Sequence, residues 1–292
     1  MTAANEYEIK QQLCDIGRRI WQKGFCAGNE GNHSYRLGPN LFLCTPTGVS
    51  KGNLSPDDLC TVDGSGHQLA GRLKRSSEFL MHAAIYNARP DVVAVIHSHP
   101  PHATAFAVAG VDLPTGIHPE AEVFLGPVRM AKYVTPGDHR LAESILPFVQ
   151  NSNTVLMGNH GVVCFDTDLE QCYYKLEIVD AYARILLLAA QLGRVNTLGL
   201  EQMNELIALK SNFGLTDPRT DAAKKGESVC ENSEFVSRFG AGRPAGSQPP
   251  VDLDSRIRRL IPQDLSPEDM ETLVRTITKR VLAELGTAQR NA

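Results

Sequence analysis

One short segment of the chain combines an apolar strand pattern with two histidines and then prevents the strand from continuing. Residues 92–96 read Val-Val-Ala-Val-Ile, a run rich in β-branched residues that predicts a buried strand. His97 and His99 follow, and because side chains alternate along a strand, they project to the same side. Pro100 and Pro101 then end the strand. Two histidines on one face supply half of a divalent-metal site, for which zinc is the favoured ion.

Two other segments carry residues that could complete such a site. Upstream, Glu78 stands near the start of a helix predicted over 77–88. Downstream, His160 separates two apolar runs, and Gly161 after it permits a tight turn or a close approach of backbone. Three histidines and a carboxylate can form a catalytic zinc set in which substrate displaces the carboxylate. Taken singly, Glu78 could instead serve the helix dipole and His160 could be an ordinary turn residue.

Composition favours a cytoplasmic enzyme. The chain has 292 residues, of which 42% are hydrophobic, enough for one core and an appendage. Its net charge of −4, with both signs interspersed, argues against a nucleic-acid binder. Seven cysteines occur singly, without a C-x-x-C pair, which favours reduced thiols over a disulfide framework. We expect no membrane span and no signal peptide, because no apolar run is long enough and the first residues lack a basic and an apolar segment.

Helices and strands are expected to alternate without a strict βαβ repeat. Periodicity predicts helices over 6–23, 77–88, 101–108, 138–150, 169–192 and 200–211. Strands are predicted over 32–37, 41–45, 59–62 and 92–96, near Val123 and Val134, and on both sides of His160. This order predicts an α/β fold with a mixed, largely antiparallel central sheet.

The chain changes character after about residue 216. We expect a main domain over 1–216, a flexible Gly/Pro-rich linker region over 217–265 and an amphipathic C-terminal helix over 266–286. Ser266 is a suitable N-cap and Pro267 a suitable first helical residue. The apolar stripe of this helix consists of Met270, Leu273, Val274, Ile277, Val281 and Leu285. A tethered helix cannot bury that stripe alone, so it must dock on its own domain, self-associate or enter a partner groove.

Five blocks of sequence, taken in order, resemble the class II aldolase and adducin family, the zinc-dependent group that includes L-fuculose-1-phosphate aldolase. The blocks are residues 27–34, 45–50, 76–78, 97–102 and 159–161. The resemblance covers about residues 6–216. It implies that the mixed, largely antiparallel sheet is sandwiched between helical layers, as in other class II aldolases, and that the enzyme is a homotetramer.

The resemblance also implies roles for individual residues. The ligands of one Zn²⁺ per subunit would be Glu78, His97, His99 and His160. Glu78 would in addition be the catalytic base that exchanges a proton at C1. The family's phosphate-binding positions are occupied here by Asn32, Thr47, Gly48, Ser76 and Ser77, which could otherwise be turn and cap residues. Glu120 resembles a catalytic glutamate that some members carry near this position. It could otherwise be a loop carboxylate without a catalytic role.

The implied reaction is zinc-dependent aldol cleavage of a deoxy-ketose 1-phosphate. L-Fuculose 1-phosphate is the expected substrate, and dihydroxyacetone phosphate and L-lactaldehyde are the expected products. Zinc can polarise the C2 oxygen and spread the charge of the enediolate. The stretch 113–122, however, lacks the tyrosine that donates a proton in the fuculose branch, and Phe213 stands where that branch has another tyrosine. The proton donor to the aldehyde fragment is therefore open.

Three alternatives stay open beside this interpretation: an L-rhamnulose-1-phosphate aldolase, a methylthioribulose-1-phosphate dehydratase-type lyase, and a non-catalytic adducin-like binding module. The epimerase branch is disfavoured because it has aspartate at the position of Glu78. The helix expected over 266–286 resembles the encapsulation peptides of bacterial microcompartment enzymes. It could therefore bind a shell protein and place the enzyme in a microcompartment lumen, or it could dock on the host tetramer. We expect no nucleic-acid or membrane partner.

Overall fold

An eight-stranded sheet forms the centre of the fold in a computed structural model that describes residues 3–137, 139–227, 229–230 and 235–236. The strands lie in the order β4-β3-β2-β1-β5-β8-β7-β6. Their bounds are β1 (Asn32–Gly38), β2 (Leu41–Cys44), β3 (Cys60–Val62), β4 (Gln68–Ala70), β5 (Ala94–Ser98), β6 (Arg129–Ala131), β7 (Thr154–Met157) and β8 (Gly161–Asp166). Every neighbouring pair is antiparallel except β6 and β7, which are parallel. The predicted fold class, α/β with a mixed, largely antiparallel sheet, is confirmed.

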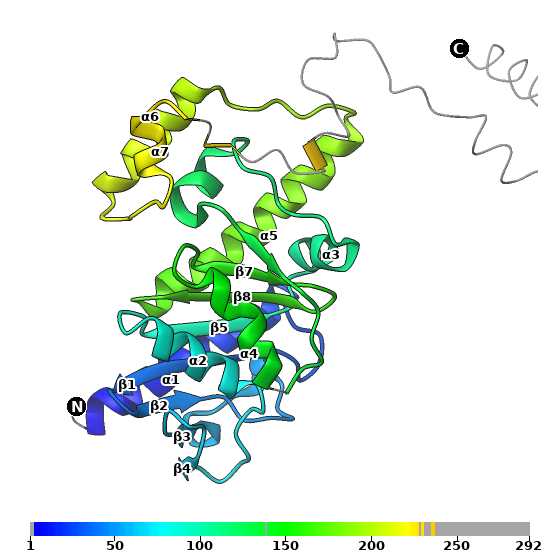
Figure 1. Cartoon of the computed structure of the whole chain (residues 1–292). Coiled ribbons are helices and arrows are strands. Elements are labelled where there is room, and N and C mark those ends of the chain that lie inside the picture. Colours follow the sequence, from blue (N-terminus) through cyan, green and yellow to red (C-terminus); the bar gives the residue numbers. More distant parts are fainter. Residues whose placement is uncertain (1–2, 138, 228, 231–234, 237–292) are drawn as a thin grey trace, which may run out of the picture. The chain divides into compact units, whose positions relative to one another are not determined.

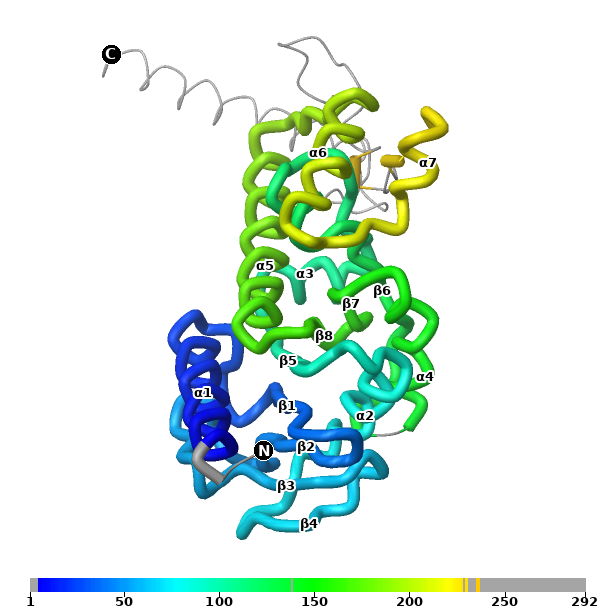
Figure 2. The backbone as a smooth tube through the Cα atoms, turned by 90° about the vertical axis from the view of Figure 1, so that its left-hand side faces the viewer, coloured from blue at the N-terminus to red at the C-terminus, as the bar shows by residue number. Residues whose placement is uncertain are grey.

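Helices cover both faces of this sheet (Figures 1 and 2). One face packs against α1 (Ala3–Gln22), α3 (Pro101–Ala109) and α5 (Leu169–Gln191). The other packs against α2 (Phe79–Ala88) and α4 (His139–Ile145). A smaller apolar cluster forms around α6 (Leu200–Asn212) and α7 (Thr220–Lys224). Two short 3-10 helices, η1 (Lys51–Asn53) and η2 (Pro56–Asp58), lie between β2 and β3.

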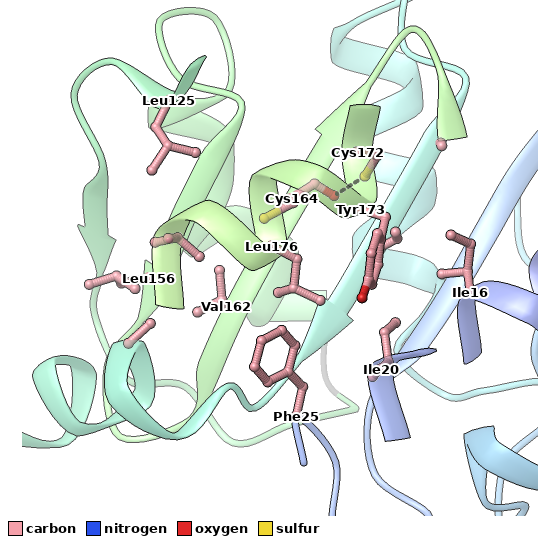
Figure 3. Close-up of a cluster of buried hydrophobic side chains, with 14 of the residues drawn as sticks. Ile16, Ile20, Phe25, Leu125, Leu156, Val162, Cys164, Cys172, Tyr173 and Leu176 are labelled. Carbon is pink, nitrogen blue, oxygen red and sulfur yellow. Dashed lines mark hydrogen bonds between the residues drawn. The ribbon is translucent and has the colours of Figure 1, made fainter. Parts of the chain in front are cut away.

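Strand β5 shows how the sequence builds these layers. Ala94 and Ile96 belong to the core that packs against α1 and α5, whereas Val95 belongs to the core that packs against α2 and α4. Successive side chains on a strand point to opposite faces, so a strand covered on both faces needs an unbroken apolar run. Figure 3 shows Leu176 of α5 and Val162 of β8 in the first of these cores. The apolar run before the two histidines therefore fixes them at the end of a central strand that is covered on both faces.

The stretch around Val123, expected as a strand, is instead a short π-helix, η3 (Ala121–Leu125). The N–H group of Gly126 donates to the carbonyl oxygen of Ala121 at 2.9 Å, which closes a five-residue turn. An apolar run this short contains too few residues to distinguish a strand period from a helical one.

Two further boundaries differ from the expectation. The strand expected near Val134 lies earlier, as β6, because its partner β7 ends opposite Ala131 and offers no further pairing. The helix expected over 138–150 is divided into α4 and a 3-10 helix, η4 (Leu146–Phe148). Pro147 accounts for this division, since proline has no N–H group to continue the α-helical pattern.

Within the region expected as a flexible linker over 217–265, the structure describes residues 217–227, 229–230 and 235–236. Helix α7 lies within it, and the ring of Phe235 lies 5.5 Å from that of Phe106 in the α1–α5 core. Outside the described residues lie 228, 231–234, 237–265 and the helix expected over 266–286. In the described part of the chain, no helix is long and apolar enough to cross a membrane.

Because two histidines are fully buried, we expect the free energy of unfolding to decrease at acidic pH. Burial lowers the pKa of both His33 and His82 from the usual 6.5 to about 3. Between these values the unfolded chain binds protons that the native state excludes. The free energy of unfolding therefore falls as the pH drops from 6.5 towards 3, by about 1.4 kcal/mol per histidine and pH unit.

Denaturant unfolding at pH 7, 6 and 5 measures this slope. His33→Gln should remove the share of this one histidine, about 1.4 kcal/mol per pH unit below pH 6.5, because glutamine does not titrate yet keeps an N–H group for the carbonyl oxygen of Leu13, which lies 2.8 Å from Nε2 of His33. An unchanged slope in the variant would show that His33 is not a source of the acid sensitivity.

Candidate active site

Three histidines from separate parts of the sequence meet beside one end of β5. His97 lies in β5, His99 directly follows that strand, and His160 lies in the turn between β7 and β8. Strand β5 pairs with β8, and this pairing brings His160 beside the other two although they are about sixty residues apart in sequence. The ring centroids are 4.7 to 5.0 Å apart, and one nitrogen from each ring lies within 4.8 Å of the others. We call these three residues the histidine triad.

The hydrogen bonds and burial of the histidine triad suit metal binding. Nδ1 of His97 lies 2.8 Å from the carbonyl oxygen of Val162. A carbonyl only accepts, so Nδ1 carries the proton and Nε2 keeps its lone pair, 3.2 Å from Nε2 of His99. Burial lowers the pKa of all three imidazoles, and repulsion from neighbouring triad members adds to this for His97 and His99. The neutral imidazole is the form that binds a cation.

Glu78 adds a carboxylate to the histidine triad. It precedes α2, and its two oxygens lie 3.3 Å from Nε2 of His97 and 3.6 Å from Nε2 of His160. The side-chain amide of Asn32 donates to Oε2 of Glu78 at 2.6 Å and holds the carboxylate in place. Three neutral nitrogens and one carboxylate oxygen match the ligand types that a divalent transition metal prefers. The residues present therefore fit the metal that the sequence predicts.

Gly161 lets the backbone pass close behind the histidine triad. A Cβ atom at this position would lie 2.5 Å from Cδ2 of His99 and 2.6 Å from the carbonyl oxygen of Ser98. Gly161→Ala should therefore push β8 away from β5, weaken metal binding by about tenfold or more and lower the free energy of unfolding by about 1–3 kcal/mol.

Metal titration and denaturant unfolding check this prediction. Gly28→Ala is the matched control, since a Cβ atom there has nothing within 4 Å. Equal metal affinities and equal free energies of unfolding in the two variants would show that the site does not need the close approach of backbone at Gly161.

A cavity of about 180 Å³ lies over the histidine triad and Glu78. Its other walls come from two loops and the start of α2, namely Asn29, Glu30, Gly31, Asn32, Pro46, Thr47, Ser76 and Ser77. The loops that carry Thr47 and Ser76 are joined by two backbone hydrogen bonds, from Thr47 to the Lys74 carbonyl at 2.9 Å and from Ser76 to the Thr45 carbonyl at 3.1 Å. Four of the five residues expected to contact phosphate thus line one cavity.

Three of these five residues also have structural roles. The hydroxyl oxygen of Ser76 accepts the N–H group of Glu78 at 3.3 Å, as a cap residue would. Gly48 does not line the cavity, but its φ of 75° belongs to the left-handed region that favours glycine in the turn after Thr47. The nitrogen of the Asn32 amide is engaged with Glu78, so in this structure Asn32 positions the carboxylate.

Glu120 is not part of this cavity. Its side chain is 62% exposed, and its Oε2 lies 3.3 Å from Nδ1 of His118. A catalytic role for Glu120 needs a neighbouring subunit or a different position of this segment, and the role stays a prediction.

Two charged residues beside the cavity carry no role in the sequence-based assignment. Glu30 lines the cavity, with Oε1 3.7 Å from Nδ1 of His99 and 2.7 Å from the N–H group of Ala27. Lys51 is buried directly behind the cavity wall, where it binds the carbonyl oxygen of Asn29. Glu30 lies within the sequence block 27–34, so its position near the site could have been predicted from the family resemblance. Nothing in the sequence predicts that Lys51 is buried.

Comparisons with known proteins agree with this geometry. The model of the Class II Aldolase and Adducin N-terminal domain matches residues 11–187. An L-fuculose phosphate aldolase of Methanococcus maripaludis is 33% identical over 174 residues, which cover 60% of this chain and 93% of that protein. A 3-oxo-tetronate 4-phosphate decarboxylase of Escherichia coli K12 is 31% identical over 185 residues, covering 62% and 87%. The crystal structure of an L-fuculose 1-phosphate aldolase matches with a TM-score of 0.65 and 28% identity, covering 71% and 97%.

Proposed function

Because this chain belongs to the class II aldolase and adducin N-terminal domain family, we propose that it is a zinc-dependent aldolase that cleaves L-fuculose 1-phosphate to dihydroxyacetone phosphate and L-lactaldehyde. The membership makes the protein a class II aldolase family enzyme, a carbon–carbon lyase or decarboxylase. The observation that carries the proposal is the convergence of the histidine triad and Glu78 beneath a cavity lined by hydroxyl groups.

The residues of the chain supply separate parts of the proposed reaction. Thr47, Ser76 and Ser77 offer hydroxyl donors for the phosphate beside the N-terminus of α2, where the helix dipole favours an anion. Glu78, held by Asn32, transfers the proton at the hydroxymethyl carbon of the dihydroxyacetone phosphate fragment, the carbon that carries the negative charge after cleavage. A divalent cation held by the four donors would supply Lewis acidity towards that developing charge.

Decarboxylation is the second candidate, because relatives with that name match nearly as well as the aldolases do. Loss of carbon dioxide from a 3-oxo acid also leaves a negative charge beside a carbonyl group, so the same donors could serve. The alignment with the L-fuculose phosphate aldolase covers 93% of that protein at 33% identity, against 87% at 31% for the decarboxylase. The aldolase is therefore the first candidate.

Assays of product release test the proposal. The zinc-loaded protein is given the 1-phosphates of L-fuculose and L-rhamnulose, ribulose 5-phosphate, methylthioribulose 1-phosphate and 3-oxo-tetronate 4-phosphate. Dihydroxyacetone phosphate, carbon dioxide and dehydration products are measured, with and without a chelator. Chelator-sensitive release of dihydroxyacetone phosphate from L-fuculose 1-phosphate supports the proposal. Carbon dioxide release identifies the decarboxylase, and metal binding without any release leaves a binding module.

The assembly of the enzyme belongs to the same proposal. We propose a homotetramer whose residues 266–286 bind a microcompartment shell protein, on the strength of the family resemblance and the apolar stripe in that segment. Light scattering measures the subunit number. A fluorescent protein fused to residues 266–286 should enter purified shells, whereas a fusion with the stripe residues Leu273 and Ile277 changed to glutamine should stay outside.

A further inference from the structure

Lys51 is a fully buried lysine without an acidic partner. It begins η1 and is only 1% exposed. Its Nζ donates to the carbonyl oxygens of Val49 at 2.7 Å and Asn29 at 2.9 Å. Among the residues that the structure describes, no carboxylate oxygen lies within 4 Å of this Nζ. An ammonium group removed from water without a counter-charge is costly, so its retention here calls for an explanation.

The position of Lys51 supplies that explanation. Asn29 lines the cavity over the histidine triad, and Val49 follows the turn that carries Thr47. Nζ of Lys51 therefore joins two loops that form walls of the same cavity. Gly17 of α1 packs against η1 so closely that a Cβ atom there would lie 2.5 Å from the carbonyl oxygen of Lys51. The ammonium is thus fixed behind the cavity rather than free to reach solvent.

Its charge acts on the groups of the site. Burial lowers the pKa of His97, and the charge of Lys51 adds to this effect. Burial also lowers the pKa of Lys51 itself, and the negative charges of Glu30 and Glu78 partly oppose that shift. No lysine or arginine is present among the described residues that line this cavity, whereas two glutamates are. An entering phosphate dianion would meet those carboxylates, and Lys51 is a cation placed to offset them.

We propose that Lys51 is a positioning residue for an anionic substrate: its ammonium ties the two loops together, and its unpaired charge is balanced by the phosphate group that binds in the cavity. This inference rests on the proposed function, since it takes the cavity to be the phosphate site. Lys51 acts through the loops and through its field, and it makes no contact with the reacting carbon.

Two substitutions in the zinc-loaded full-length protein separate the parts of this role. Lys51→Gln keeps an N–H donor for the two carbonyl oxygens but removes the charge, and Lys51→Met removes both. Lys224→Met, at an exposed lysine of α7, is the control. Inorganic phosphate is the probe, its dissociation constant is measured by calorimetry, and zinc content is measured in parallel.

We expect Lys51→Gln to bind phosphate about tenfold more weakly and Lys51→Met more weakly still, because the methionine also loses the donor to the two loops, with zinc content unchanged and Lys224→Met like the parent. With the sugar phosphate that proves to be the substrate, KM should rise more than kcat falls, because the charge favours binding rather than one step. Phosphate affinity within twofold of the parent in Lys51→Gln would overturn the charge role. If Lys51→Met fails to fold, Lys51→Gln decides alone.

The result for the parent protein separates this inference from the proposed function. If the zinc-loaded parent shows no phosphate binding, the assignment of the cavity as a phosphate site is wrong, and the inference falls with it. If the parent binds phosphate and Lys51→Gln binds it equally well, only the role of Lys51 is wrong.

Discussion

Replacing His97 with alanine should abolish metal binding and lyase activity together while leaving the fold largely intact. His97 is the most buried member of the histidine triad, and its Nε2 lies within 3.3 Å of both His99 and Glu78. Its loss removes one of four donors, so metal affinity should fall about a hundredfold or more. The destabilisation should stay near 1–3 kcal/mol, because the Val162 carbonyl oxygen loses its donor and a small cavity forms.

Metal content after dialysis, product release and denaturant unfolding measure these three quantities on one sample. His67→Ala is the control, because His67 is exposed and its backbone N–H group, rather than its ring, binds Asp63. Activity and metal content of His97→Ala at the level of this control would show that the histidine triad is not the metal site. An unfolded variant would not answer the question, and His99→Ala, at a less buried ring, then replaces it.

Local rules predict two parts of the histidine triad, but not the meeting of those parts. Strand alternation places His97 and His99 on one side, and their ring centroids are 4.9 Å apart. The apolar runs on both sides of His160 predict a hairpin, which is observed as β7 and β8. That this hairpin lies next to β5 is a long-range fact, and it was reached through the family resemblance rather than through periodicity.

Other features depend on packing that no local pattern encodes. Lys51 occurs in a Val-Ser-Lys-Gly-Asn stretch that is typical of a solvated turn, and it is buried because α1 covers η1. Phe235 follows a polar segment, yet it packs against Phe106 in the core. Glu120 was assigned by resemblance alone; its side chain is exposed in the single chain, and its catalytic role stays a prediction. The type of a residue indicates the chemistry it can perform. Whether its side chain is buried depends on which elements, distant in sequence, pack against it.

Glu78→Gln should reduce kcat by about 10²–10⁴-fold with a much smaller loss of metal affinity. Glutamine has nearly the same shape, and its side-chain oxygen can still accept the Asn32 amide that now lies 2.6 Å from Oε2. The substitution therefore keeps the position of the side chain but removes its ability to take a proton. Glu30→Gln is the matched control, since Glu30 lines the same cavity 3.7 Å from His99, and its kcat should stay within about fivefold of the parent.

Exchange of a proton on the hydroxymethyl carbon of dihydroxyacetone phosphate with solvent deuterium isolates this role. The exchange needs the base and the metal but no aldehyde, so it is independent of the unidentified proton donor and of the sugar. If Glu78 is the base, exchange and cleavage should fall together in Glu78→Gln and persist in Glu30→Gln.

Exchange at the parent rate in zinc-loaded Glu78→Gln would show that Glu78 is a metal ligand and not the base. The base would then be another group in the cavity, where Glu30 is the nearest carboxylate to His99. Loss of metal from Glu78→Gln would instead make its ligand role dominant, and added zinc should then restore exchange in proportion to occupancy.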